Sequence, residues 1–320
     1  MKYFVTGGAG FIGSSIVDAL LAKGDEVIVY DNLVTGNMEF LEKAMKNPKN
    51  KFKLIKGDLL DKEQLNKAMA GIDFVFHMAA NADIKDNLKE PIKCLEQNTI
   101  VTSNVLEAMR FNNVKQIVFA STGSVYGEPD VFPTPEDYKF PIQTSMYAAS
   151  KLSCEGLLEA YSIGYGFKVF IFRFVSLMGE RYTHGCIFDF YKKLLDNPKE
   201  LLILGDGKQK KSYLYIQDCI DAIFTAIKKS KTDINIYNLG TEEYMQVTDI
   251  ADLVCKELGL KNVKYNFSGG TRGWVGDSPF ILLDVKKIKS LGWKPKLTIA
   301  QAATRTINWL RDNQWALKRS

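Results

Sequence analysis

The chain has 320 residues, of which 46% are hydrophobic, and it can therefore bury a large core in one long domain or two smaller ones. Its formal charge of +5 is the balance of 42 basic and 37 acidic side chains, and no basic run interleaved with aromatic residues indicates a nucleic-acid surface. No apolar stretch is long enough to span a membrane and no signal peptide precedes the first motif, so we expect a cytoplasmic protein without a membrane partner.

The cysteines and histidines argue against metal chemistry. Their odd number and irregular spacing predict reduced, mostly buried thiols, and two histidines are too few for a zinc cluster. We therefore expect no metal site. The residues concerned are Cys94, Cys154, Cys186, Cys219, Cys255, His77 and His184.

The first predicted element is a strand that runs into a glycine-rich turn and then a helix. An apolar run at 3–5 precedes Gly7, Gly10 and Gly13, and an amphipathic segment follows at 12–21. Gly7 can form the turn, Gly10 lets the backbone approach a pyrophosphate, and Gly13 lets the helix pack closely on the strand. Because the helix N-terminus presents free N–H groups to phosphates, the pattern predicts a dinucleotide site. An ordinary turn is the alternative.

The second predicted strand, 26–30, ends at Asp31, 18 positions after Gly13. A carboxylate there can accept hydrogen bonds from the adenosine ribose and would repel a 2′-phosphate, which favours NAD over NADP. The alternative is a solvated aspartate in a turn.

Further short apolar strands alternate with helical patterns. The alternation predicts an α/β fold with a doubly wound parallel sheet of the Rossmann type. After about residue 175 the helices shorten and glycine, proline and aromatic residues cluster. We expect an NAD-binding domain at 1–175 and a smaller α/β substrate lobe at 176–320, with a soft boundary and some strand exchange. The predicted strands are 52–55, 74–76, 116–120 and 169–172, and the helical patterns lie near 61–70, 91–112, 145–165 and 247–258.

The candidate catalytic residues are Thr122, Tyr147 and Lys151. Tyr147 and Lys151 lie four positions apart, on one face of a predicted helix. A nearby cation lowers the pKa of a phenol and makes it a usable general base. Thr122 follows a predicted strand, where its hydroxyl can bind the substrate oxygen that Tyr147 deprotonates. A surface tyrosine–lysine pair and an ordinary polar loop are the alternatives.

As an ordered set, these motifs resemble the extended short-chain dehydrogenase/reductase family, and within it the nucleotide-sugar epimerases of the UDP-glucose 4-epimerase type. The resemblance covers nearly the whole chain. The segments that carry it are 6–13, 31–33, 57–59, 77–80, 121–127, 147–151 and 291–295.

The resemblance implies roles for further residues. The cofactor set, besides Tyr147 and Lys151, comprises Gly7, Gly10, Phe11, Ile12, Gly13, Asp31, Asn32, Asp58, Leu59, Ala79 and Ala80. The substrate set comprises Asp83, Ser124, Ser176, Thr183, His184, Lys211, Arg272 and Asp277. Two positions depart from the family pattern: Ser176 replaces the usual asparagine, and Lys211 replaces an arginine that would offer a planar fork to phosphate.

The expected reaction is 4-epimerisation of a nucleotide sugar, with UDP-hexose favoured, by transient oxidation at C4. The related 4,6-dehydratases carry Asp-Glu directly after the catalytic threonine, whereas this chain has Gly123 and Ser124, neither of which is an acid at neutral pH. A nucleotide-sugar 4-dehydrogenase or 4-ketoreductase remains open, as does another NAD-dependent epimerase or dehydratase. A non-catalytic NAD-binding sensor is the alternative from a different class. The resemblance also suggests a homodimer.

Overall fold

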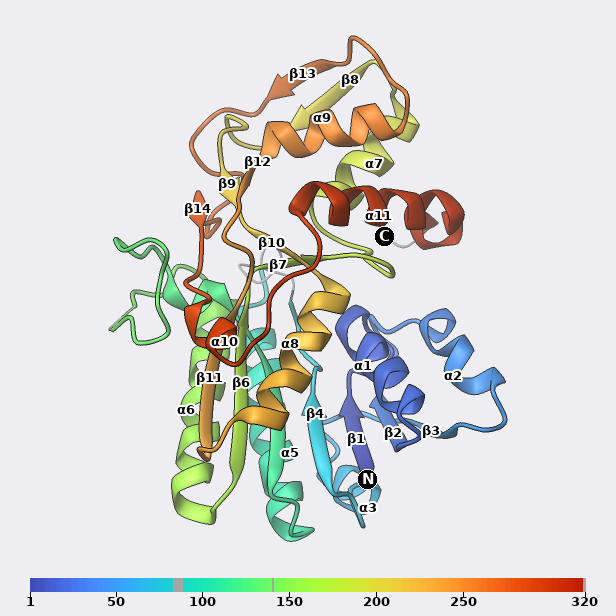
Figure 1. Ribbon diagram of the computed structural model, residues 1–320, viewed down its shortest axis with the longest axis vertical. Coiled ribbons are helices and arrows are strands. Elements are labelled where there is room, and N and C mark those ends of the chain that lie inside the picture. The colour runs from blue at the N-terminus through green and yellow to red at the C-terminus, as the bar shows by residue number, and fades with distance from the viewer. Residues whose placement is uncertain (83–88, 140, 319–320) are drawn as a thin grey trace. The chain divides into compact units, whose positions relative to one another are not determined.

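The computed structural model describes residues 1–82, 89–139 and 141–318 (Figure 1). Contacts within the chain define two compact units. The first comprises Met1–Val125, Ser145–Arg173 and Ala226–Tyr237, and the second comprises Tyr126–Thr144, Phe174–Thr225 and Asn238–Ser320. The units interleave along the chain, and the single domain boundary at residue 175 stays a prediction.

The first unit is built on a seven-stranded sheet with the order β11-β6-β5-β4-β1-β2-β3. The pairs β1–β2, β2–β3, β1–β4 and β4–β5 are parallel. The strand order reverses between β1 and β4, which is where ligands bind in sheets of this kind. The predicted α/β, doubly wound fold is confirmed. The strands are β1 (Lys2–Thr6), β2 (Glu26–Asp31), β3 (Lys51–Lys56), β4 (Phe74–His77), β5 (Gln116–Thr122), β6 (Lys168–Phe174) and β11 (Ile234–Leu239).

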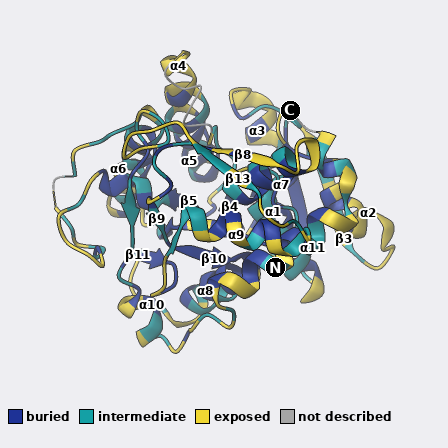
Figure 2. Ribbon diagram, turned by 90° about the horizontal axis from the view of Figure 1, so that it is seen from above, coloured by how far each residue is buried: buried dark blue, intermediate teal, exposed yellow. Residues whose placement is uncertain are grey.

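Capping residues define the two ends of α6. Ser145 caps α6 (Met146–Tyr165) by accepting a hydrogen bond from the Ala148 N–H at 3.1 Å, and Gly166 ends the helix with a φ of 67°. The helices present one buried and one exposed face (Figure 2). Others of the first unit are α1 (Phe11–Ala22), α2 (Glu42–Lys46), which follows the short η1 (Met38–Leu41), and α3 (Lys62–Ala68).

The predicted helix near 91–112 is divided into three parts. It begins as α4 (Pro91–Cys94), continues as one π-helical segment, η3 (Leu95–Ile100), and becomes α5 (Val101–Phe111). The buried Asn98 lies within η3. Single π turns inside helices are frequent at functional sites, and they follow from tertiary contacts that periodicity does not reveal.

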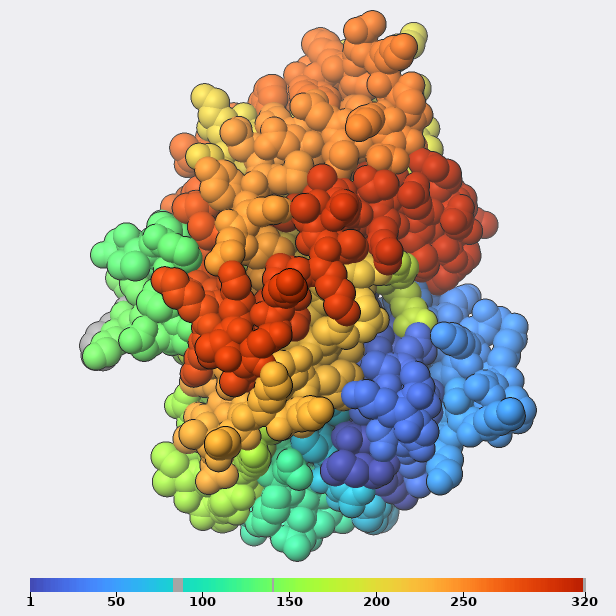
Figure 3. Space-filling view, in the orientation of Figure 1, coloured from blue at the N-terminus to red at the C-terminus, as the bar shows by residue number. Residues whose placement is uncertain are grey.

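The second unit contains small sheets and several helices. β7 (Ser176–Met178) pairs with β10 (Tyr213–Tyr215), and β8 (Glu200–Ile203) pairs with β13 (Lys264–Phe267). β9 (Lys210–Lys211) lies between β12 (Met245–Gln246) and β14 (Phe280–Ile281). α9 (Val247–Glu257) packs against α11 (Ile299–Asp312), and Figure 3 shows the two in orange and red on one face. The remaining helices are α7 (Cys186–Asp196) and α10 (Lys286–Ser290), while α8 (Ile216–Lys229) runs from the second unit into the first.

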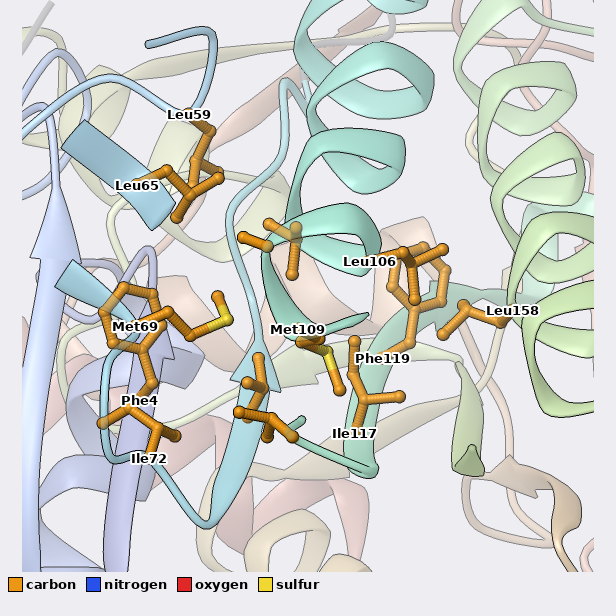
Figure 4. Packing of buried hydrophobic residues seen from close by; sticks show 14 of the residues in the cluster. Phe4, Leu59, Leu65, Met69, Ile72, Leu106, Met109, Ile117, Phe119 and Leu158 are labelled. Carbon is orange, nitrogen blue, oxygen red and sulfur yellow. The ribbon is translucent and has the colours of Figure 1, made fainter. Parts of the chain in front are cut away.

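The core of the first unit fills the space between its sheet and its helices. Figure 4 shows Phe4 of β1, Leu65 of α3, Leu106 of α5 and Phe119 of β5 among its buried side chains. Burial of such apolar side chains contributes about 1.5–3 kcal/mol each. The core therefore holds in place the carboxyl ends of the strands, which the predicted cofactor and catalytic residues follow. Every helix among the described residues is too short or too polar to cross a bilayer.

His77, on β4, is buried within this unit. Its Nδ1 lies 2.7 Å from the Thr6 hydroxyl and its Nε2 lies 3.0 Å from the Thr102 hydroxyl. Burial, together with the nearby Lys151 ammonium, lowers the pKa of His77 to about 3. The folded chain therefore binds no proton at His77 at pH 5, whereas an unfolded histidine with an ordinary pKa does. The free energy of unfolding therefore decreases as the pH is lowered below the ordinary histidine pKa.

We expect His77→Gln to flatten the acid dependence of stability. Between pH 8 and pH 5, the wild-type free energy of unfolding should fall by about 2 kcal/mol more than that of the variant. Urea titrations at both pH values measure the difference. His184→Gln, which changes the exposed second histidine, serves as the control and should follow the wild type. An equal pH dependence for His77→Gln and the wild type would refute this account of His77.

Candidate active site

The glycine turn between β1 and α1 has no room for side chains. A Cβ on Gly13 would lie 2.2 Å from the Gly7 carbonyl oxygen, and one on Gly7 would lie 2.7 Å from the Ala79 backbone. Gly7 also has a φ of 64°. Its N–H donates to the Tyr30 carbonyl at 3.0 Å, which joins the turn to β2. The turn thus forms a cradle of bare backbone at the N-terminus of α1, as a pyrophosphate requires.

A cavity of about 740 Å³ opens beside this cradle. Residues that follow β1, β2 and β4 form part of its wall, at the point where the strand order reverses. A cavity of this volume, with glycine backbone and carboxylates on its wall, fits a dinucleotide. The predicted cofactor residues that line it are Gly7, Gly10, Asp31, Asn32, Asp58, Leu59, Ala79 and Ala80. Phe11, Ile12 and Gly13 lie in the first turn of α1, behind the cradle.

The two predicted carboxylates have structural partners as well as a place on the cavity wall. Asp31 accepts hydrogen bonds from the Ala9 N–H at 2.9 Å and the Leu33 N–H at 2.8 Å. Asp58 accepts from the Leu60 N–H at 2.9 Å and from the Asn32 side-chain amide at 3.2 Å. Asp31 is buried at the end of β2 and is therefore not the solvated turn aspartate considered as the alternative. These hydrogen bonds hold each carboxylate in place without removing it from the cavity.

The end of β5 and the first turns of α6 bring the candidate catalytic residues together. The Tyr147 phenol lies close to the side chain of Thr122, which favours the ionised form of the phenol. The Thr122 hydroxyl also accepts from the Ser124 N–H at 3.1 Å. Lys151, which is 2% exposed, donates from Nζ to the Ala120 carbonyl at 2.9 Å and lies 4.6 Å from the centre of the Phe119 ring. All three side chains therefore converge on the last residues of one strand.

The expectation that Tyr147 has a lowered pKa is wrong for this structure. Burial raises the pKa of Tyr147 to about 12, and the Thr122 side chain only partly opposes the shift. Burial also lowers the pKa of Lys151 to about 8, against the opposing influence of Cys154 and Glu155. For both residues, burial affects the pKa more than the neighbouring side chains do, because a charged group loses its hydration when it is buried.

Two sets of buried polar residues around this centre were not predicted. Asn98 donates to the Ser150 hydroxyl at 2.9 Å, and Ser150 donates to the Tyr147 carbonyl at 2.8 Å. Glu155, on the same helix, pairs with Arg173 and accepts from Ser121. The available signal was the spacing of Tyr147, Lys151 and Glu155, which repeats every four residues and places a second charged group on the buried face.

The predicted diphosphate residues form a cluster in the second unit. The Lys211 ammonium lies 2.6 Å from the Asp277 carboxylate and also donates to the Ser278 carbonyl. Arg272 pairs with Glu128 and donates to the Asp277 carbonyl at 3.0 Å. The Asp277 carboxylate in turn accepts from the Gly273 N–H at 3.0 Å. The structure thus brings Lys211, Arg272 and Asp277 together, with their charges already paired within the chain.

The other predicted substrate residues are dispersed. Ser176 begins β7 and is exposed, and Thr183 and His184 lie just before α7, where the His184 ring stacks on Tyr182 at 5.5 Å. Ser124 belongs to the first unit and is half-buried in the turn after Thr122. Asp83 lies outside the described residues. In the part of the chain that the structure describes, no three histidine, cysteine or carboxylate side chains are arranged to hold a metal ion.

The chain is similar to proteins named as nucleotide-sugar epimerases over nearly its whole length. A putative UDP-glucose 4-epimerase of Methanocaldococcus jannaschii is 34% identical over 97% of this chain and 98% of its own. A crystal structure of a UDP-galactose 4-epimerase is 37% identical, covers 98% of this chain and 100% of its own, and superposes with a TM-score of 0.85. The NAD complex of the Thermus thermophilus UDP-glucose 4-epimerase is 33% identical over 97% of this chain and 99% of its own, with a TM-score of 0.86.

Related sequences also include a UDP-N-acetyl-alpha-D-glucosaminuronate decarboxylase of Bacillus cytotoxicus at 29% identity. A trifunctional enzyme of Arabidopsis thaliana, whose activities include UDP-glucose 4,6-dehydratase, is 28% identical, and the match covers 47% of its length. The cofactor of the family is NAD, which the glycine cradle and its cavity fit. The sequence profile of the NAD dependent epimerase/dehydratase family matches residues 3–240, and the chain belongs to that family.

Proposed function

We propose that this protein is an NAD-dependent nucleotide-sugar 4-epimerase, an isomerase that acts on UDP-hexoses. The observation that carries the proposal is the convergence of Tyr147, Thr122 and Lys151 on the end of β5, where Lys151 donates to the Ala120 carbonyl. This centre and the cofactor cavity belong to the same unit of the chain. The site thus holds the Tyr147 phenol, the Thr122 hydroxyl and the Lys151 ammonium at the end of one strand. These are the groups needed to take a proton from a sugar hydroxyl.

In the proposed mechanism, the Thr122 hydroxyl and the Tyr147 phenol oxygen bind the C4 hydroxyl of the sugar. Tyr147, once ionised, accepts the hydroxyl proton at its phenolate oxygen, and the resulting phenol later returns it to the same sugar oxygen. Lys151 stabilises the phenolate while it exists. NAD⁺, when bound, supplies the oxidant for C4 and a positively charged ring. Since the pKa of Tyr147 is raised to about 12 by burial, added positive charge nearby is what makes this phenol an effective base.

The residues after Thr122 favour epimerisation over dehydration. Expulsion of the C6 hydroxyl needs a proton donor beside the reacting sugar, and Gly123 and Ser124 do not provide one. We further propose that Lys211, Arg272 and Asp277 bind the nucleotide diphosphate and ribose. Asp83, Ser124, Ser176, Thr183 and His184 are proposed to contact the sugar. The observation in support is that Lys211 and Arg272 already lie together around Asp277, since a diphosphate needs two cations within reach.

A panel of UDP-, GDP- and CDP-sugars, incubated with the NAD-loaded protein, tests the reaction. We expect NMR of at least one UDP-hexose reaction to show the C4 epimer, with no net change in absorbance at the NADH band. Stoichiometric NADH formation or consumption would indicate a 4-dehydrogenase or 4-ketoreductase. A 6-deoxy-4-keto product or release of CO₂ would indicate a dehydratase or decarboxylase. If the protein binds NAD but converts none of the sugars, the result would favour a non-catalytic NAD-binding sensor.

We also propose a cytoplasmic homodimer, on the basis of the family resemblance. Light scattering after size exclusion should then give a mass of twice 36.1 kDa. A mass of 36.1 kDa across the working concentration range would contradict the proposed dimer.

Asp31→Asn should erode the preference for NAD over NADP. The amide keeps an oxygen acceptor for a backbone N–H but loses the charge that repels a 2′-phosphate. We expect the ratio of the two dissociation constants to shift towards NADP by at least about tenfold. Calorimetric titration of both cofactors gives this ratio. Asp58→Asn, whose carboxylate also lines the cavity, should weaken both cofactors alike. An unchanged ratio in Asp31→Asn would show that Asp31 does not select the cofactor.

A further inference from the structure

A buried ion pair lies one helical turn beyond Lys151. Glu155 is 2% exposed, and Arg173, on β6, approaches its carboxylate with Nη2 at 2.7 Å and Nε at 3.1 and 3.2 Å. Removing a charge pair from water is costly, and a pair of similar volume made of apolar residues is often as stable. Stability alone therefore does not account for this pair. Its position relative to Lys151 suggests another role.

The Glu155 carboxylate is also tied to the end of β5. The Ser121 hydroxyl donates to it. Ser121 lies between Ala120, whose carbonyl accepts from Lys151, and Thr122, whose side chain lies close to the Tyr147 phenol. The Glu155 carboxylate thus holds Ser121, the strand residue between those that contact Lys151 and Tyr147. Loss of this contact would loosen α6 against the strand at the centre of the proposed site.

Glu155 also supplies a negative charge that acts on the buried lysine. Burial lowers the pKa of Lys151, and Cys154 and Glu155 act in the opposite direction. Burial raises the pKa of the Cys154 thiol, so that this group is uncharged at neutral pH and contributes no anion. The other titratable groups around Lys151 and the pair are Tyr147 and Glu159 on α6, His77 on β4 and Arg173 on β6. Of these, the half-buried Glu159 faces Glu155 and Arg173.

We propose that Glu155 is a positioning residue, held by Arg173 and Ser121, which keeps Lys151 protonated and directed at the end of β5. The proposal rests on the proposed function for its catalytic consequence. The Lys151 ammonium and the Glu155 carboxylate are successive charged groups on one buried helix face, and the charge of the carboxylate favours the charged form of the amine. Arg173 and Ser121 prevent the carboxylate from swinging into direct contact with that amine.

The test is a titration of Lys151 in the full-length, NAD-loaded protein. The protein carries ¹³C at the lysine Cε positions, and the Lys151 signal is identified by its loss in Lys151→Arg. We expect Glu155→Gln to lower the pKa of this signal by about one unit. Glu159→Gln, which removes a carboxylate one turn further along the same helix, should leave it unchanged. An unchanged Lys151 pKa in Glu155→Gln would overturn the proposal.

A second variant distinguishes two causes of a change in the Lys151 pKa: the loss of the Glu155 charge, and the Arg173 charge that is left without its partner. Glu155→Gln/Arg173→Met removes both charges and keeps the core filled, so it also serves if the single variant fails to fold. The proposal requires the Lys151 pKa to stay below the wild-type value in this double variant. A return to the wild-type value would mean that unpaired Arg173, not missing Glu155, caused the shift, and the proposal would be wrong.

Kinetics give the catalytic readout. In Glu155→Gln, kcat should fall about tenfold at pH 8, with KM for the sugar within about twofold of wild type, and the basic limb of the pH–rate profile should move to lower pH. Glu159→Gln should retain the wild-type profile. Unaltered kcat and pH profile in Glu155→Gln would contradict the positioning role. If the sugar panel shows no turnover, the ¹³C titration still decides the role of Glu155, and only the proposed function fails.

Discussion

Tyr147→Phe is expected to lower kcat for the nucleotide sugar about 1,000-fold while leaving NAD bound. The substitution removes only the phenol oxygen, which is the proposed proton acceptor. The ring remains to fill its place on α6, where it is half-buried beside Thr122. The effect should therefore fall on kcat more than on KM, since the lost interaction is made by the reacting oxygen. Initial rates with the substrate identified by the panel, together with calorimetric titration of NAD, measure both quantities.

Tyr161→Phe provides the matched control on the same helix. Its hydroxyl donates to the Glu107 carboxylate at 2.6 Å, away from the end of β5. This variant should retain the wild-type kcat within about twofold, although it loses a hydrogen bond that contributes about 1 kcal/mol to folding. If Tyr147→Phe turned over sugar at the rate of Tyr161→Phe, another group would have to be the base.

Gly13→Ala is expected to abolish measurable NAD binding and to destabilise the chain. The new Cβ would meet the Gly7 carbonyl at 2.2 Å and the Gly8 Cα at 2.8 Å. Both are backbone atoms of the cradle, so the turn itself must move. We expect the free energy of unfolding to fall by about 3 kcal/mol and the affinity for NAD to fall by at least about 100-fold. Urea titration and calorimetry measure the two effects.

Gly156→Ala gives the contrasting result with the same chemical change. Gly156 lies inside α6, and no atom stands within 4 Å of the position that its Cβ would take. Alanine there should stabilise the chain by about 0.5–1 kcal/mol, because it restricts the unfolded backbone and favours the helix. NAD affinity should not change. If Gly13→Ala behaved like Gly156→Ala, the close packing of α1 on the glycine turn would not be needed to form the cofactor site.

The fold could be predicted because its signals are local in the sequence. Short apolar strands, the glycine turn and the serine cap of α6 each depend on residues only a few positions apart, and the sheet follows from their order. The π-helical segment Leu95–Ile100 was not predicted, since it depends on contacts of Asn98 with residues 17 and 52 positions away. Likewise, periodicity could not assign β11, from the predicted second lobe, to the edge of the first unit's sheet.

The candidate site was predicted in its residues but not in its electrostatics. Spacing placed Tyr147 and Lys151 on one face, and the structure has both at the end of β5. The direction of the Tyr147 pKa shift was wrong because burial depends on surrounding side chains that spacing does not specify. Glu155 was missed for a related reason: its partners, Arg173 and Ser121, are 18 and 34 positions away. The paired state of Lys211 with Asp277 likewise depends on contacts between distant segments.

The fate of the C4 hydrogen tests the central claim most directly. NAD-loaded protein is incubated with UDP-glucose that carries deuterium at C4, and with its N-acetylated and uronate counterparts prepared in the same way, and the products are read by NMR. An epimerase that oxidises C4 and reduces the same carbon must return the label to C4 of the inverted sugar. We therefore predict full retention there. Label found at C6, in the nicotinamide pool or in water, or no inverted sugar from any of them, would contradict the account.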